Sequence, residues 1–173
     1  YTQAYTFPYT TLFRSRWEAD ISGFWTVART AAALRRRGAG GKPPSGLPAL
    51  LVFTDPARTP DLEALARRTP RGAALVYRSF GAADAEATAH RLRAILHGRG
   101  ALLLIGADAA LAARVRADGV HLPERQAARP LGRRGWLVTA AAHSIRAARR
   151  ARADAVVVSA VFPSNSPSAG APL

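Results

Sequence analysis

The chain has 173 residues, a formal net charge of +14 and no cysteine. The missing cysteines exclude disulfides, thiolate metal sites and cysteine nucleophiles, which fits a cytoplasmic protein. No apolar run approaches the roughly 20 residues that cross a membrane, so we expect no membrane partner and no secretory signal.

The positive charge comes almost entirely from arginine, because Lys42 is the only lysine. A strongly basic chain can bind nucleic acid through its phosphates. The arginines are scattered over many predicted helices, however, and do not form one stripe with aromatic residues between them. GC-rich codons also explain an excess of Arg, Ala, Gly and Pro. We therefore predict no nucleic-acid partner.

Residues 1–15 differ in composition from the rest, being rich in Thr and Tyr where the remainder is rich in Ala and Arg. A DNA that resembles a common sequencing-adaptor end would encode residues 7–15. We interpret 1–15 as a non-native segment, with a natural disordered extension as the alternative. Residues 16–48 are predicted to hold a helix over 20–37 and a Gly/Pro linker.

Apolar runs alternate with amphipathic stretches from residue 49 onward. The runs are continuously apolar, as in parallel strands with both faces buried, and the alternation indicates βαβ units. The predicted strands are 49–55, 73–80, 101–106, 118–123, 135–141 and 154–162, and the predicted helices are 59–68, 82–99, 108–116 and 144–152.

Residues 49–173 are therefore predicted to form an α/β domain, an incomplete (β/α)8 TIM barrel with about six βα units. The close spacing of the later units favours a barrel over a doubly wound sheet. A complete barrel has eight strands and at least about 200 residues. We accordingly expect this chain to be a C-terminally truncated piece of a longer protein.

Side chains at the carboxyl ends of barrel strands face the active-site mouth. His121 lies near the end of the fourth predicted strand, in "DGVHLP". The loop "VFPSNSPS" after the sixth strand offers Ser164, Ser166 and flexible backbone N–H groups, which suit a phosphate or another oxyanion. A polar turn without a ligand is the alternative reading of that loop.

Five motifs together resemble the thiamine phosphate synthase/TenI-like family. They are, in chain order, "LVFTD", "LVYRSF", "ALAARVRADGVHLPE", "TAAAHS" and "ADAVVVSAVFPSNSPSAGAPL", and the resemblance covers about residues 50–173. It implies a (β/α)8 barrel in thiamine biosynthesis. The family's synthases join a hydroxymethylpyrimidine diphosphate to a thiazole phosphate and release diphosphate, so a small phosphate or diphosphate substrate is implied. A homodimer is left open for the full-length protein.

The resemblance also assigns roles, because the leaving diphosphate builds up negative charge that Mg²⁺ and cationic side chains stabilise. The family pattern Gln-x-Arg-x-Lys keeps Arg78 here but has Val76 and Phe80 at its flanking positions. The predicted catalytic residues are Arg78, His121 and His143; Arg78, Glu124, Ser164 and Ser166 are the predicted phosphate-binding residues.

The expected metal ligands are changed. Gly106 and Ala107 stand where the family has Asn-Asp, Gln126 replaces a second Asp, and Pro167 replaces a lysine. Two carboxylates with waters can hold Mg²⁺, so a shifted site on Asp108 and Glu124 is one hypothesis.

Two further hypotheses follow. The thiazole tautomerases of the same family carry a His after strand five, where this chain has "AAHS", so His143 is a candidate proton carrier. A helix-capping turn with an exposed His143 is the alternative there. The lost carboxylates instead favour a non-catalytic binder of thiazole or thiamine phosphates.

Overall fold

The computed structural model describes residues 46–56, 58–132 and 135–159, together with residues 26, 29, 30 and 33. These four residues are helical and fall inside the predicted helix 20–37, whose other residues lie outside the described part. The predicted segment 1–15 also lies outside it. Within the described residues, no helix is long and apolar enough to cross a membrane.

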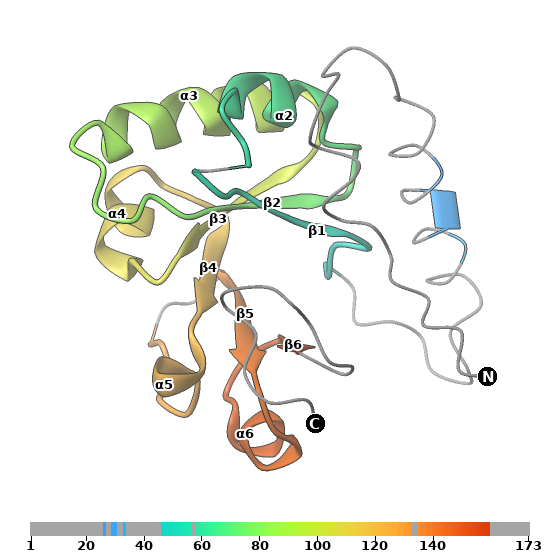
Figure 1. Ribbon diagram of the computed structural model, residues 1–173, viewed down its shortest axis with the longest axis vertical. Coiled ribbons are helices and arrows are strands. Elements are labelled where there is room, and N and C mark those ends of the chain that lie inside the picture. Colours follow the sequence, from blue (N-terminus) through green and yellow to red (C-terminus); the bar gives the residue numbers. More distant parts are fainter. Residues whose placement is uncertain are drawn as a thin grey trace.

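Strands and helices alternate along the described chain, as predicted (Figure 1). The strands are β1 (Leu51–Phe53), β2 (Ala74–Tyr77), β3 (Leu102–Gly106), β4 (Gly119–Leu122), β5 (Leu137–Ala142) and β6 (Ala155–Val158). The helices are α2 (Leu62–Arg68), α3 (Ala85–Gly98), α4 (Ala109–Arg114), α5 (Glu124–Ala127) and α6 (Ile145–Arg150).

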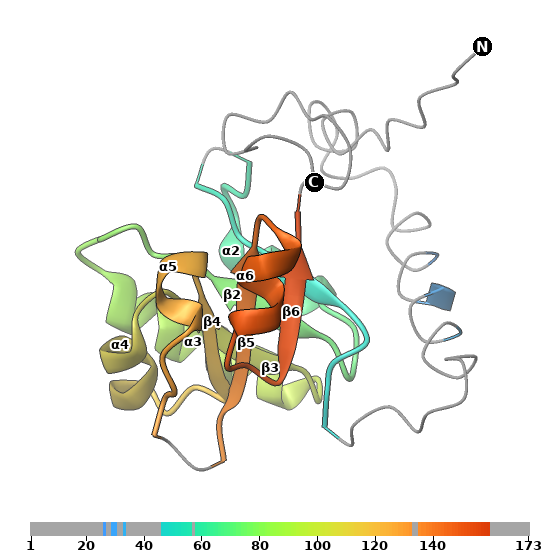
Figure 2. The ribbon, with the colours of Figure 1, turned by 90° about the horizontal axis from the view of Figure 1, so that it is seen from below.

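All six strands form one parallel sheet in the order β1-β2-β3-β4-β5-β6, so each strand pairs with its neighbour in the sequence. Helices α2 to α6 follow one side of the curved sheet (Figure 1). A view turned by 90° shows β6 beside β5 (Figure 2). Sequential parallel pairing with helices on one side is the arrangement of a (β/α) barrel wall. The predicted fold class is therefore confirmed.

The two faces of the sheet carry different side chains because successive residues of a strand point to opposite sides. The outer face packs against the helices and forms the main core, with Leu75, Leu103, Ile105 and Val120 fully buried. The inner face holds a smaller apolar cluster built on Ala74, Val76 and Leu104, with Leu51, Phe53, Leu102 and Leu137 packed against it. A barrel positions its active site where this inner face reaches the carboxyl ends of the strands.

Two aspartates make the same kind of hydrogen bond to a neighbouring strand at the amino-terminal edge of the sheet. The Asp118 carboxylate accepts a hydrogen bond of 2.8 Å from the backbone N–H of Leu103, and Asp154 accepts one of 2.8 Å from the N–H of Val138. Each aspartate directly precedes a strand and ties it to the strand before. The Asp of the "ADGVHL" motif therefore has a structural role, far along β4 from the rim.

Gly119 allows β4 and β5 to lie in contact. A Cβ atom built at Gly119 would lie 1.9 Å from the carbonyl oxygen of Leu137, which no side chain tolerates. On the inner face, backbone atoms of Leu137 therefore occupy the space that a side chain at position 119 would need. The glycine of "ADGVHL" is required by this close approach of backbones.

Candidate active site

The register of the sheet brings Arg78 and His121 to the same end of the inner face. Val76 pairs with Leu104, and Gly106 pairs with His121. Arg78 lies two residues beyond Val76, and its Cγ would be 2.9 Å from a Cβ at Gly106. Because two residues along a strand return to the same face, these groups form one row at the carboxyl rim, as the sequence predicts.

Arg78 is held in place by the end of β1. Its Nε donates to the carbonyl oxygen of Thr54 at 2.6 Å, and a terminal nitrogen lies 3.3 Å from Asp55 Oδ2. Its backbone N–H donates to Thr54 Oγ1 at 2.9 Å. The side chain remains about one-third exposed. Arg78 is thus a positioned cation at the rim, oriented by two residues that the sequence motifs contain but that were not predicted as site residues.

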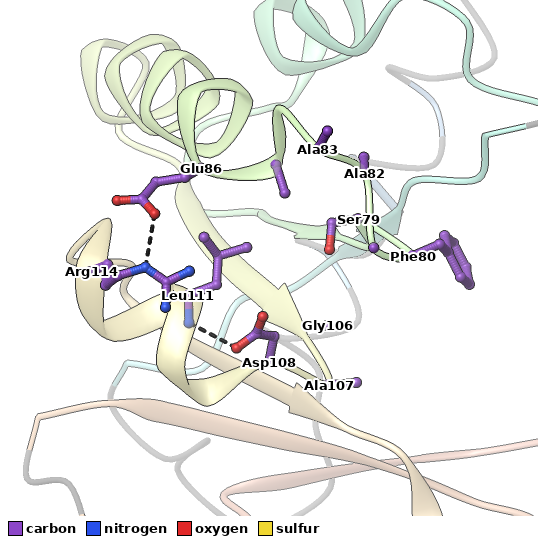
Figure 3. Close-up of a pocket in the computed structure, with 12 residues that line it drawn as sticks. Ser79, Phe80, Ala82, Ala83, Glu86, Gly106, Ala107, Asp108, Leu111 and Arg114 are labelled. Carbon is purple, nitrogen blue, oxygen red and sulfur yellow. Dashed lines mark hydrogen bonds and ion pairs between the residues drawn. The ribbon is translucent and has the colours of Figure 1, made fainter.

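Phe80 lies beside this cation in an unusual backbone conformation. Its φ of +48° falls in the left-handed region, which bulky residues seldom occupy. The Arg78 guanidinium carbon lies 5.2 Å from the centre of the Phe80 ring, within the range of a cation–π contact. The ring is otherwise exposed and points away from Asp108 and Glu86 (Figure 3). Phe80 therefore flanks Arg78 where the family pattern has a lysine.

His121 is almost fully buried in the inner face. Its Nδ1 lies 2.9 Å from Thr139 Oγ1, and the Phe53 ring meets it edge to face at 4.9 Å between ring centres. Burial, and to a smaller extent the charge of Arg78, lower the pKa of His121 to about 4. The imidazole is therefore neutral at physiological pH.

Glu124 and His143 contact each other across the carboxyl ends of β4 and β5. Glu124 Oε2 accepts a hydrogen bond from the His143 backbone N–H and lies 3.1 Å from its Nδ1. The backbone hydrogen bond, together with the side chain of His143, lowers the pKa of the Glu124 carboxyl. The adjacent Ser144 caps α6, its Oγ accepting from the Ala147 N–H at 3.0 Å. Ser144, and not His143, is the capping residue of this turn.

Asp108 lies in a different place, at the start of α4. Its Oδ1 accepts a hydrogen bond of 2.8 Å from the Leu111 N–H and caps the helix. It lines an open pocket of about 400 Å³ between the loops after β2 and β3 (Figure 3). Glu86 and Arg114 bridge one side of this pocket at 2.8 Å. Glu124 lines a separate hollow next to α6.

This arrangement gives the hypothetical Mg²⁺ site on Asp108 and Glu124 no support. Each carboxylate already accepts a backbone N–H, and the two line different pockets. Among the described residues, no three His, Asp or Glu side chains are grouped to hold a metal ion. Asp108 and Glu124 are not brought together among the described residues, and the shifted Mg²⁺ site stays a prediction.

Two expected site residues, Ser164 and Ser166, lie outside the described part of the chain, as does Pro167, which stands where the family pattern has a lysine. Conversely, the residues that orient the rim were not predicted: Thr54 and Asp55 for Arg78, and Thr139 for His121. The signal for the first two was present, since polar residues directly after an apolar strand mark a barrel rim. Thr139 had no such signal, because its role depends on the register between β4 and β5.

A curved, sequentially ordered parallel sheet with a positioned arginine and a neutral histidine at its carboxyl rim defines a (β/α)-barrel domain. The sequence model described as "TMP-TENI: Thiamine monophosphate synthase" matches residues 50–173. This chain belongs to the thiamine monophosphate synthase (TMP-TENI) family, which confirms the resemblance seen in its motifs.

Two relatives illustrate the match. The thiamine-phosphate synthase of Alcanivorax borkumensis is 44% identical over 79 residues, which are 42% of this chain and 36% of that protein. The solved structure of a thiamine phosphate pyrophosphorylase from Pyrococcus furiosus superposes with a TM-score of 0.54 at 25% identity, over 68% of this chain and 62% of that one. The chain thus spans about a third to three-fifths of the length of these relatives.

Proposed function

We propose that this chain forms part of a thiamine-biosynthesis enzyme of the thiamine phosphate synthase type. In that reaction a hydroxymethylpyrimidine diphosphate is joined to a thiazole phosphate. The bond between the pyrimidine methylene and the diphosphate breaks, and the diphosphate leaves with the electron pair. The family match and the position of Arg78 support the proposal.

The role of Arg78 is to receive the charge of the leaving diphosphate. Its contacts with Thr54 and Asp55 fix the guanidinium plane at the inner rim. The remaining N–H groups of the guanidinium are geometrically suited to pair with phosphate oxygens. A cation held in place before the reaction lowers the transition-state energy without reorganisation. In the family's synthases Mg²⁺ supplies further charge stabilisation; no step proposed here depends on it.

Diphosphate binding tests this role directly. Titration of the protein with inorganic diphosphate in metal-free buffer, followed by calorimetry, is expected to show binding that Arg78→Gln weakens at least about tenfold, because a charge-assisted hydrogen bond is lost. Arg91→Gln is the matched control, since Arg91 pairs with Glu63 on the helix side of the sheet. Equal effects of the two substitutions would rule out a specific role for Arg78.

Turnover provides the second arm of this test. With both thiamine precursors and Mg²⁺, formation of thiamine phosphate is expected to depend on Arg78 and to survive Arg91→Gln. Binding of the phosphate ligands without turnover would instead support the alternative function of a non-catalytic binder.

The Glu124–His143 pair favours a second candidate, isomerisation of a thiazole carboxylate phosphate. A carboxylate on Nδ1 holds an imidazole with its proton on that nitrogen and leaves Nε2 to accept a proton from the substrate. The 3.1 Å contact between Glu124 Oε2 and His143 Nδ1 supports this role for Glu124. The two groups are partly exposed, so a ligand has access to them.

Substitution separates this candidate from the first. Loss of a general base costs about 10²–10⁴-fold in rate, so His143→Gln is expected to abolish tautomerisation and Glu124→Gln to reduce it. Ser144→Ala, which removes only the α6 cap, is expected to lower stability and leave the rate unchanged. An unchanged rate in His143→Gln would eliminate this candidate.

A further inference from the structure

Phe80 lies in a tight turn that seldom contains a bulky residue. The N–H of Ala82 donates to the carbonyl oxygen of Ser79 at 3.0 Å and closes the turn. Both residues between them are left-handed, with φ of +48° at Phe80 and +80° at Gly81. Two left-handed central residues are the mark of a type I′ turn, whose first central position favours Asn, Asp or Gly. A phenylalanine at that position strains the backbone, and strain of this kind gathers at functional sites.

Burial of the ring does not explain why a phenylalanine stands there. Phe80 is 67% exposed, and its ring points away from Asp108 and Glu86 in the neighbouring pocket (Figure 3). Within the part of the chain that the structure describes, the ring has one charged partner, Arg78, whose guanidinium carbon lies over it at 5.2 Å from the ring centre. The strained turn therefore presents an exposed ring to the cation of the candidate site.

The ring adds a third restraint to those that already hold Arg78. Arg78 Nε donates to the carbonyl oxygen of Thr54, and one terminal nitrogen contacts Asp55 Oδ2. Both contacts are made by the edge of a planar group, which can still tilt about that edge. A ring over the face of the guanidinium opposes this tilt. The other terminal nitrogen is bonded to none of the described residues, and its N–H groups suit an oxyanion.

We propose that Phe80 is a positioning residue for Arg78. Its ring, presented by the 79–82 turn, covers one face of the guanidinium and keeps the uncommitted terminal nitrogen directed at phosphate oxygens. The inference rests on the proposed function, which makes Arg78 the cation that receives the diphosphate. Phe80 stands where the family pattern has a lysine, so this chain places an orienting ring where a second charge is expected.

Diphosphate binding in metal-free buffer tests the role of the ring. Phe80→Leu keeps an apolar side chain and is expected to weaken binding about threefold, the size of an exposed cation–π contact. Phe80→Tyr keeps the ring and is expected to keep the affinity. In the Arg78→Gln background, Phe80→Leu is expected to weaken binding no further, because the ring acts through the guanidinium. A loss in Arg78→Gln without one in Phe80→Leu would overturn the inference and leave the proposed function standing.

Opposite changes in stability and affinity separate positioning from a merely structural role. Phe80→Asn introduces a residue that tolerates the left-handed conformation. It is expected to raise the melting temperature and to weaken diphosphate binding about threefold. Ala107→Gly is the matched control, because Ala107 is also left-handed, with φ of +63°, and carries no ring; it is expected to raise the melting temperature and leave the affinity unchanged. A joint fall of stability and affinity in Phe80→Asn would refute positioning.

Hydrogen exchange of the Arg78 Nε–H, followed by nitrogen-15 NMR of the 173-residue protein, measures the restraint without any ligand. This proton is expected to exchange faster in Phe80→Leu and at the original rate in Phe80→Tyr. Arg99 is the internal reference, since its Nε–H also donates to a threonine carbonyl oxygen, that of Thr69, and its rate is expected to stay constant. An Arg78 exchange rate that is the same in all three proteins would overturn the inference, whatever the outcome of the diphosphate titration.

Discussion

Gly119 and Leu137 bring the main chains of β4 and β5 so close that a single added methyl group would collide with a carbonyl oxygen. We predict that Gly119→Ala destabilises the protein by about 3 kcal/mol or more, because main chain cannot move aside as a side chain can. Chemical denaturation measures the effect. Gly98→Ala is the control, since open space surrounds that helical glycine, and it is expected to stabilise by about 0.5–1 kcal/mol.

His121 predicts a specific loss of stability in acid. Its pKa falls from 6.5 to about 4 on folding, so between these values the unfolded chain binds more protons than the folded one. Stability therefore rises with pH across this window and is lost as pH falls through it, by about 3 kcal/mol in total. The difference between the unfolding free energies of the protein and of His121→Asn, followed from pH 7 to pH 4, isolates this residue. If the unfolding free energies of the protein and of His121→Asn changed with pH in the same way, the prediction would be contradicted.

Replacement of Ala107 by glycine is expected to stabilise the protein. Ala107 follows β3 with φ of +63°, a conformation that costs a residue with a Cβ about 1 kcal/mol. Ala107→Gly is expected to raise the free energy of unfolding by about 0.5–1 kcal/mol. Ala110→Gly, in the first turn of α4, is expected to lower it, because glycine loses more backbone entropy than alanine when it is fixed in a helix. In thermal denaturation, the melting temperatures of the two variants are therefore expected to shift in opposite directions from that of the unsubstituted protein.

The paired aspartates predict matched losses. Asp118→Asn and Asp154→Asn each weaken a charge-assisted hydrogen bond to the backbone of the preceding strand, and each is expected to cost about 1.5 kcal/mol. Asp118 also lies 2.9 Å from His97 Nε2. The coupling between Asp118 and His97 in a double-mutant cycle is expected to stay below about 1 kcal/mol, because the pair is partly exposed. A coupling that accounts for the whole effect of Asp118→Asn would show that the backbone bond contributes nothing.

The alternation of strands and helices could be predicted because each strand is a short apolar run and each break contains Gly, Pro or a capping residue. Strand ends were less predictable. The predicted strand 73–80 continues to Phe80, whereas β2 ends at Tyr77 because the chain turns through a left-handed residue. The short helix α5 was missed, since four residues carry no helical periodicity.

The candidate site was predictable only along single strands. Parallel strands deliver Arg78 and His121 to one rim, and this follows from their positions near strand ends. Contacts between neighbouring strands depend on register, which the order of residues does not reveal. The pairing of Thr139 with His121 and of Glu124 with His143 therefore required the structure. Asp108 shows the converse, because the pattern that suggested a metal ligand is equally that of a helix cap.

The order of the strands in the sheet has a consequence for how this protein folds. Because every strand docks beside the one that precedes it in the sequence, a newly made segment always finds its partner already present. Each βα unit can therefore be added while the ribosome is still translating the next, without waiting for distant parts of the polypeptide. Growth of this kind proceeds in one direction, from β1 toward β6.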